Sequence, residues 1–150
     1  MEKMSQYFFT AGLITVALAT MLYVWYAFTR QGDAGRFATI FAWVAAALLT
    51  GSVITRTIVA QRGPFANMYE FTLSFGWGIL VAYVVMERQY KLRTIGAFVV
   101  PVSLLLLLYA LTVPSAVQPL VPALQNNLLL TIHVSLAIVA YAMVAVAFGA

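Results

Sequence analysis

The stretch from Thr94 to Ala150 contains no Asp, Glu, Lys or Arg. A soluble domain cannot be built on such a stretch, because about 25% of the residues in soluble domains are charged. The rest of the chain is little different, since only 8% of all 150 residues are charged and 64% are hydrophobic. The sequence therefore predicts a protein that lies in a lipid bilayer.

Apolar runs long enough to cross a bilayer as helices, about 20 residues each, recur along the chain. They predict an all-α fold, a polytopic transmembrane bundle in which residues 1–150 form one domain, with about five spanning helices near residues 7–28, 37–57, 68–86, 95–113 and 127–150. Prolines and amides between Pro114 and Asn127 separate the last two helices. The final run reaches Ala150 without a basic or polar stop signal, so we expect the N-terminal part of a longer protein.

The distribution of basic residues between the predicted helices indicates the orientation in the membrane. One side of the membrane carries Lys3, Arg56 and Arg62. The other side carries Arg30, Arg36, Arg88, Lys91 and Arg93. The majority side is expected in the cytoplasm, so the N-terminus lies outside and the C-terminal end inside, in the plasma (inner) membrane or in a thylakoid membrane.

The residue types that are missing exclude several functions. The chain has no Cys, so disulfides, thiolate metal sites and covalent haem attachment through its own thiols are excluded. The basic residues lie in short gaps between apolar runs, which is typical of topology signals and gives no reason to expect a nucleic-acid partner. The sequence also lacks a glycine-rich phosphate loop and an HExxH motif.

His133 is the only histidine. Six residues after a helix start at Asn127, it is expected about 9 Å below that start, close to the outer membrane interface. Ala137 and Ala140 share its face, so a flat partner can approach there. His133 either forms a hydrogen bond to a neighbouring helix or headgroup, or acts as a neutral imidazole ligand to a metal or haem iron.

A second candidate segment joins the second and third helices. Asn67 is expected to cap the third helix, with Glu70 in a capping-box position and within reach of Arg62 for an ion pair. Arg56 and Arg62 either bind an anionic group, such as a propionate or a lipid phosphate, or extend to lipid headgroups. Trp77 is interpreted as a packing residue.

Three segments of the chain carry a family pattern: Gly63 to Glu70, Gly96 to Pro101, and Pro122 to Ser135. In order and spacing they resemble the CcsA/ResC family of cytochrome c biogenesis proteins, the membrane half of the System II haem-attachment machinery. The family's tryptophan-rich loop and its other histidines would follow Ala150. The resemblance is therefore to the N-terminal portion without that loop.

The resemblance implies a function in handling haem at the outer membrane face for attachment to apocytochrome c. His133 would be an axial ligand to the iron of a non-covalent haem b, and further ligands would come from outside this chain. The implied partners are a ResB/Ccs1-type membrane protein, apocytochrome c and the lipid bilayer. Residues expected to support the haem site are Arg62, Asn67, Tyr69, Glu70 and Gln125.

The resemblance also implies that the chain is one component of a cytochrome c haem lyase (synthase) complex and is not active as this portion alone. Two alternatives from other classes remain at this point. One is a small transporter or channel subunit with Glu70 and Arg56 lining a path. The other is a structural membrane subunit without a cofactor.

Overall fold

The computed structural model describes residues 1–117 and 127–150, and its helices make up all of the regular secondary structure there. In chain order they are α1 (Glu2–Thr29), α2 (Gly32–Ala60), α3 (Met68–Tyr90), the short 3-10 helix η1 (Arg93–Ile95), α4 (Gly96–Ala110) and α5 (Asn127–Gly149). Within the described ranges, 5 helical segments are long and apolar enough to cross a membrane, with η1 and α4 counted together. The predicted all-α bundle with five spans is confirmed, and the protein is a multi-pass membrane protein.

The helix ends differ from the expected ones by a few residues. The first two helices begin earlier than predicted, at Glu2 and Gly32, whereas α4 ends at Ala110 and not at residue 113. Apolar runs mark the part of a helix that faces lipid, and polar residues at either end can continue the helix. The actual ends of α1, α2 and α3 are set by residues in the left-handed conformation, with φ of 56° at Arg30, 51° at Gln61 and 55° at Lys91.

Helices α1 and α2 form an antiparallel hairpin in close contact. Small residues allow the two backbones to approach, as is common between helices in membranes. A Cβ on Gly12 would lie 2.7 Å from the Leu49 side chain, so only glycine fits there without a shift. Near the open end of the hairpin, the Ser5 hydroxyl donates to the Ser52 carbonyl at 3.2 Å, and the Ser52 hydroxyl donates to the Ser5 carbonyl at 3.0 Å.

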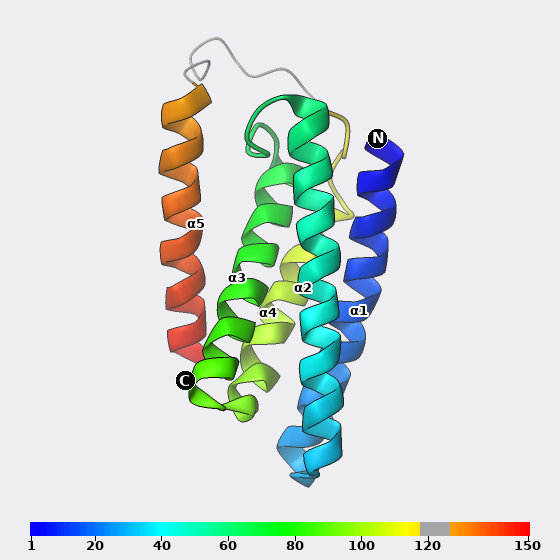
Figure 1. The fold of residues 1–150 in the computed structure, drawn as a ribbon, viewed down its shortest axis with the longest axis vertical. Coiled ribbons are helices and arrows are strands. Elements are labelled where there is room, and N and C mark those ends of the chain that lie inside the picture. The colour runs from blue at the N-terminus through cyan, green and yellow to red at the C-terminus, as the bar shows by residue number, and fades with distance from the viewer. Residues whose placement is uncertain (118–126) are drawn as a thin grey trace.

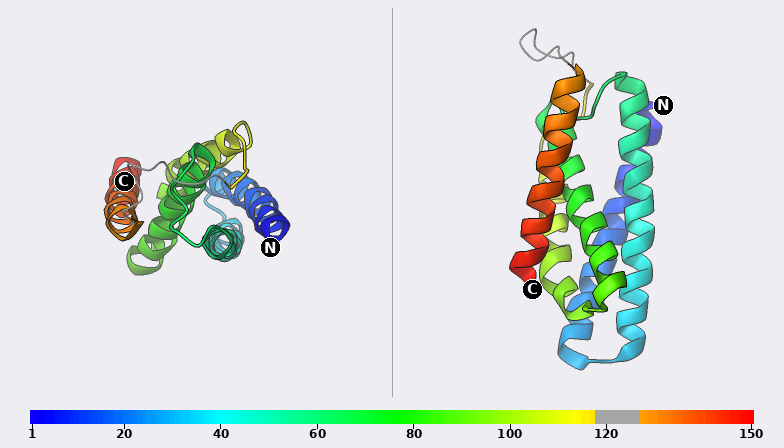
Figure 2. Two further views of the ribbon diagram at one scale, coloured as in Figure 1. Left: turned by 90° about the horizontal axis from the view of Figure 1, so that it is seen from above. Right: turned by 60° about the vertical axis from the view of Figure 1, so that its left-hand side comes forward.

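Helix α3 lies at the centre of the bundle, where it packs against α2, α4 and α5, and α4 packs in turn against α1 (Figure 2). Helix α5 lies at the periphery and packs mainly against α3 (Figure 1). We call one end of the bundle the N-terminal end, because it holds Met1, the α2–α3 loop and the start of α5. The opposite, C-terminal end holds the α1–α2 and α3–α4 turns and Ala150 (Figure 1).

A buried carboxylate joins four elements at the C-terminal end. Glu87 of α3 accepts hydrogen bonds from the hydroxyls of Tyr23 in α1, Thr39 in α2 and Tyr83 in α3, the last at 2.6 Å. The guanidinium of Arg93 in η1 lies 3.6 Å from the same carboxylate. A buried charge is tolerated only when it is paired and hydrogen-bonded, and Glu87 meets both conditions. The sequence alone had not singled out this residue.

Gly96 provides the space for this arrangement, and its replacement by alanine should destabilise the protein. A Cβ on Gly96 would overlap the Tyr83 hydroxyl and lie 2.6 Å from the Tyr23 ring, and both rings are buried. Overpacking of this kind costs about 1–3 kcal/mol. We expect a lower unfolding temperature for Gly96→Ala, measured by circular dichroism on the full-length protein in detergent.

Gly32→Ala is the matched control, because a Cβ on Gly32 meets no atom within 4 Å. Its unfolding temperature should equal that of the unchanged protein or exceed it slightly, since alanine is a better helix former than glycine. Equal unfolding temperatures for the two variants would contradict the packing assigned to Gly96.

Candidate functional site

The α2–α3 loop ends in a capped helix. The Asn67 side chain accepts a hydrogen bond from the Glu70 backbone N–H at 2.8 Å, so α3 begins at Met68 as predicted. The Glu70 carboxylate accepts from the backbone N–H of Ala66 at 2.9 Å, one residue before the N-cap. A capping box would use the N–H of the N-cap residue itself, so the bond is shifted by one position.

Glu70 holds two arginines through its two carboxylate oxygens. The Arg62 guanidinium lies 2.9 Å from one oxygen, which confirms the predicted ion pair. The Nε of Arg56 lies 3.2 Å from the other oxygen, and the Arg56 side chain is only 1% exposed. Arg56 therefore does not extend to lipid headgroups, because Glu70, which is fully buried, holds it inside the bundle. We call these three residues the Arg56–Glu70–Arg62 cluster.

Arg56 also connects the cluster to its surroundings. Its Nη2 donates to the Ser115 carbonyl, in the segment that follows α4, and its guanidinium carbon lies 4.7 Å from the centre of the Tyr69 ring. Cation–π contacts of this kind stabilise an arginine most when it is shielded from water. Its Nη1 is buried and has no hydrogen-bond partner among the residues that the structure describes.

The cluster orders the N-terminal end through further contacts. Asn67 donates from its amide to the Ala116 carbonyl at 2.9 Å, and Gln6 of α1 donates to the Ser115 hydroxyl at 3.2 Å. The Tyr69 ring packs on Phe9 of α1, with 5.4 Å between the ring centres. One carboxylate between two guanidinium groups thus lies where α1, α2, α3 and the segment after α4 meet.

The structure brings together four of the predicted support residues and places His133 elsewhere. Asn67, Tyr69, Glu70 and Arg62 form one connected group. Gln125, the fifth, lies outside the described residues.

His133 is exposed and lies on a different face of α5 from Thr131, which adjoins the α2–α3 loop. A Cβ on Gly63 would lie 2.7 Å from the Thr131 hydroxyl. Two residues turn a helix by about 200°, so the His133 side chain points away from that loop. In the described part of the chain, no three His, Cys, Asp or Glu side chains gather as a metal site.

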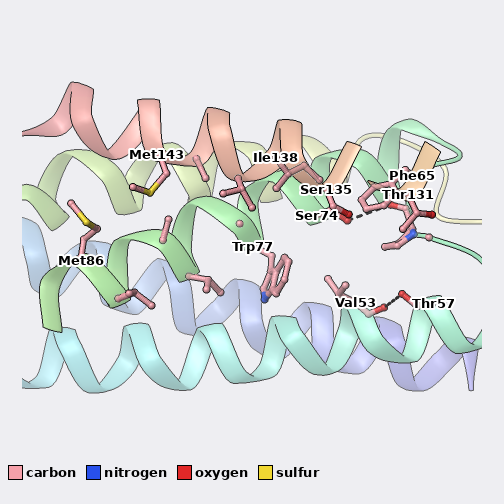
Figure 3. Close-up of a pocket in the computed structure, with 18 of the residues that line it drawn as sticks. Val53, Thr57, Phe65, Ser74, Trp77, Met86, Thr131, Ser135, Ile138 and Met143 are labelled. Carbon is pink, nitrogen blue, oxygen red and sulfur yellow. Dashed lines mark hydrogen bonds between the residues drawn. The ribbon is translucent and has the colours of Figure 1, made fainter. Parts of the chain in front are cut away.

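A cavity of about 680 Å³ runs along α3, between α2 and α5 (Figure 3). Its walls are almost entirely apolar. Trp77 lies at mid-length in this cavity, and its indole N–H donates to the Thr50 hydroxyl of α2 at 2.8 Å. We interpret Trp77 from the sequence as a packing residue, and the structure adds that its ring also lines a cavity. No sequence pattern marks the cavity, because its walls come from three separate segments.

Removing the charge of Glu70 should destabilise the bundle strongly. Glu70→Gln leaves the buried guanidinium of Arg56 without its counter-ion, and breaking a buried ion pair from one side costs about 3–5 kcal/mol. Denaturant unfolding of the full-length protein in detergent should show this loss. Asp33→Asn is the control, because Asp33 is exposed in the first turn of α2 and its charge contributes at most about 1 kcal/mol there. Similar losses for both variants would contradict the role of the cluster.

Comparison with known proteins places the chain in a family. The model of the family described as Cytochrome C assembly protein matches residues 65–150. A relative named Cytochrome c biogenesis protein CcsA from Pyropia yezoensis is 34% identical over 132 residues, which cover 84% of this chain and 41% of the relative. No solved structure matches the chain significantly.

Two further relatives carry the same name. The protein from Trieres chinensis is 38% identical over 111 residues, or 71% of this chain and 34% of the relative. The protein from Synechocystis sp. is 34% identical over 137 residues, or 85% of this chain and 39% of the relative. The chain thus spans well under half the length of the curated relatives it matches. Because the family model covers more than half of the chain, the protein belongs to the cytochrome c assembly protein family.

Proposed function

We propose that the chain forms the N-terminal part of a protein that handles haem at the outer membrane face during cytochrome c assembly, with His133 as an axial ligand to the haem iron. The observation that carries this proposal is the exposed imidazole on the outward face of α5, inside the region that matches the family. When bound, haem b supplies the vinyl groups to which cysteines of apocytochrome c become attached.

The surroundings of His133 fit a flat, mostly apolar group. Ile132 is 49% exposed and Leu136 is 65% exposed, so apolar side chains flank the imidazole on the same outward surface. The small side chains of Ala137 and Ala140 follow on the His133 face and leave room for close approach. A neutral imidazole nitrogen at His133 would hold the iron, and these neighbours would exclude water from the ring.

The Arg56–Glu70–Arg62 cluster supports this site indirectly. It fixes the α2–α3 loop, and the loop residue Gly63 lies beside Thr131 near the start of α5. Asn67, Tyr69, Glu70 and Arg62 are thus proposed as positioning residues that set the place of α5. Gln125 is kept as a proposed support residue on the resemblance alone.

We further propose that the N-terminal end faces outside and the C-terminal end faces the cytoplasm or its equivalent. Two of the three basic residues at the N-terminal end, Arg56 and Arg62, are paired with the fully buried Glu70. At the C-terminal end, by contrast, Arg30, Arg36, Arg88 and Lys91 are all exposed. The C-terminal end thus has a larger excess of exposed positive charge than the number of basic residues at each end would indicate. This excess supports the proposed orientation.

The remaining proposals concern the assembly. His133 would hold the haem on one side only, and further residues for this site would come from the remaining length of the protein or from a ResB/Ccs1-type partner. The chain would then act as one component of a haem lyase complex with apocytochrome c as substrate. A transporter path through Arg56 and Glu70 is disfavoured, because both side chains are buried and joined in one ion-paired cluster.

His133→Ala should remove most of the haem absorbance from the full-length protein purified with its partner. His133→Met should retain haem with a shifted spectrum, because a thioether ligand changes the electronic state of the iron. Ile14→Ala is the control, because Ile14 is 57% exposed on α1, on a different helix from His133, and this variant should keep the native spectrum. Haem bands that are unchanged in His133→Ala would rule out the ligand assignment.

The orientation can be tested with single cysteines introduced into the full-length protein. Glu2→Cys at the N-terminal end should react with a membrane-impermeant maleimide added to intact cells. Lys91→Cys at the C-terminal end should react only after the cells are opened, because the reagent cannot cross the bilayer. Labelling is compared with that of the unchanged protein. The reverse pattern would invert the proposed topology.

A further inference from the structure

Part of the large cavity forms an apolar groove between α3 and α5, on the side of Trp77 that faces the C-terminal end. We call it the α3–α5 groove and define it by the residues that line it: Gly78, Ala82, Val85 and Met86 of α3, with Ile138 and Met143 of α5. Figure 3 shows Met86 and Met143 at one end of the drawn cavity and Trp77 near its middle. All of these side chains are apolar, whereas the lining beyond Trp77 includes the hydroxyls of Thr57, Ser74, Thr131 and Ser135.

The dimensions of the groove match one acyl chain. From Trp77 to Gln89, which lines the mouth, α3 rises about 18 Å over twelve residues. One leaflet of the hydrocarbon core is about 15 Å thick, half of the usual 30 Å. The whole cavity holds about 680 Å³. A spanning helix about 10 Å across and 30 Å long would need more than about 2,000 Å³, so no helix fits inside it.

The groove is open to the bilayer along its side. Val85 is 44% exposed and Met143 is 47% exposed, although both line the cavity. Met86 and Met143 also line a second cavity of about 320 Å³, which extends toward Tyr90. Tyr90 is 61% exposed, at the level where aromatic side chains meet the membrane interface. A lipid can therefore enter from the side and leave its headgroup at this end.

Two exposed basic residues adjoin, in sequence, the residues that line the mouth of the groove. Arg88 and Lys91 flank Gln89 and Tyr90 in sequence, and both are exposed. Among the described residues, neither side chain takes part in an ion pair, whereas Arg93 is paired with Glu87. Glu87 also lines the second cavity, but it is 5% exposed, accepts three hydroxyl hydrogen bonds and is already paired with Arg93. The mouth is thus complementary to a phosphate.

We propose that the α3–α5 groove binds one acyl chain of an anionic phospholipid from the leaflet at the C-terminal end, with the phosphate at Arg88 and Lys91. The acyl chain of the lipid fills the space beside Trp77 and completes the packing between α5 and α3. Helix α5 packs mainly on α3, so this lipid contributes to the fixed position of α5. The proposal is independent of the haem ligand and of the orientation proposed above.

The test uses the full-length protein in nanodiscs that contain equal amounts of phosphatidylglycerol and phosphatidylcholine. After transfer to a mild detergent, native mass spectrometry counts the lipids that remain bound. We expect one phosphatidylglycerol on the unchanged protein. Ala82→Phe fills the groove and should abolish retention. Val85→Trp, at the exposed edge of the groove, should reduce retention even if Ala82→Phe fails to fold.

Matched variants separate the groove from the rest of the lipid-facing surface. Leu105→Phe adds a similar ring on the lipid side of α4, where Leu105 is 66% exposed, and should retain the lipid. Arg88→Gln combined with Lys91→Gln should bring the ratio of retained phosphatidylglycerol to phosphatidylcholine down to the ratio in the nanodisc. Arg36→Gln, an exposed cation at the same end, should leave the ratio unchanged.

Three results would overturn the proposal. The first is equal retention by Ala82→Phe, Val85→Trp and the unchanged protein. The second is equal retention of both lipids by the unchanged protein. The third is no retained lipid at all, which is expected if another helix of the longer protein or a second copy covers the groove. A lost haem spectrum in His133→Ala bears on none of these results.

Discussion

The buried carboxylate of Glu70 is the interaction on which the N-terminal end of the structure depends. It neutralises Arg56 inside the bundle, pairs with Arg62 and binds the N–H of Ala66. Without it, a guanidinium with 1% exposure would lack its counter-ion. The Arg56 guanidinium that Glu70 holds also contacts Tyr69 of α3 and the Ser115 carbonyl, and so connects α2 and α3 to the segment after α4. The loop beside the start of α5 is therefore held by ion pairs and hydrogen bonds.

A second buried carboxylate performs a similar role at the opposite end. Glu87 is the hydrogen-bond acceptor for α1, α2 and α3, and it pairs with Arg93 before α4. Both acids lie near the two ends of α3, the central helix. In a bilayer, apolar surfaces between helices provide little specific attraction, because lipid tails are equally apolar. Two buried polar anchors at fixed heights are a physical means of setting how the neighbouring helices align with α3.

Helix α5 has a different environment from the other four. It carries no Asp or Glu, and it packs on α3 with Gly63 beside Thr131, Gly78 beside Ile138, and the apolar groove between the two helices. His133 lies on its outward, exposed face. The matched relatives are more than twice as long as this chain. A helix that packs on one side and is exposed on the other leaves a surface against which the additional length of such proteins can pack.

The sequence by itself determined the five spans, because a backbone in lipid must satisfy its own hydrogen bonds as a helix. It also determined the Asn67 cap and the Arg62–Glu70 pair, since these partners are separated by one turn or one short loop. Only the tertiary structure decided that Arg56 is buried on Glu70, that Tyr23 reaches Glu87 across 64 positions, and that His133 faces away from the cluster. These features depend on how helices rotate and align against one another, which apolar periodicity leaves open when a helix is hydrophobic on every side.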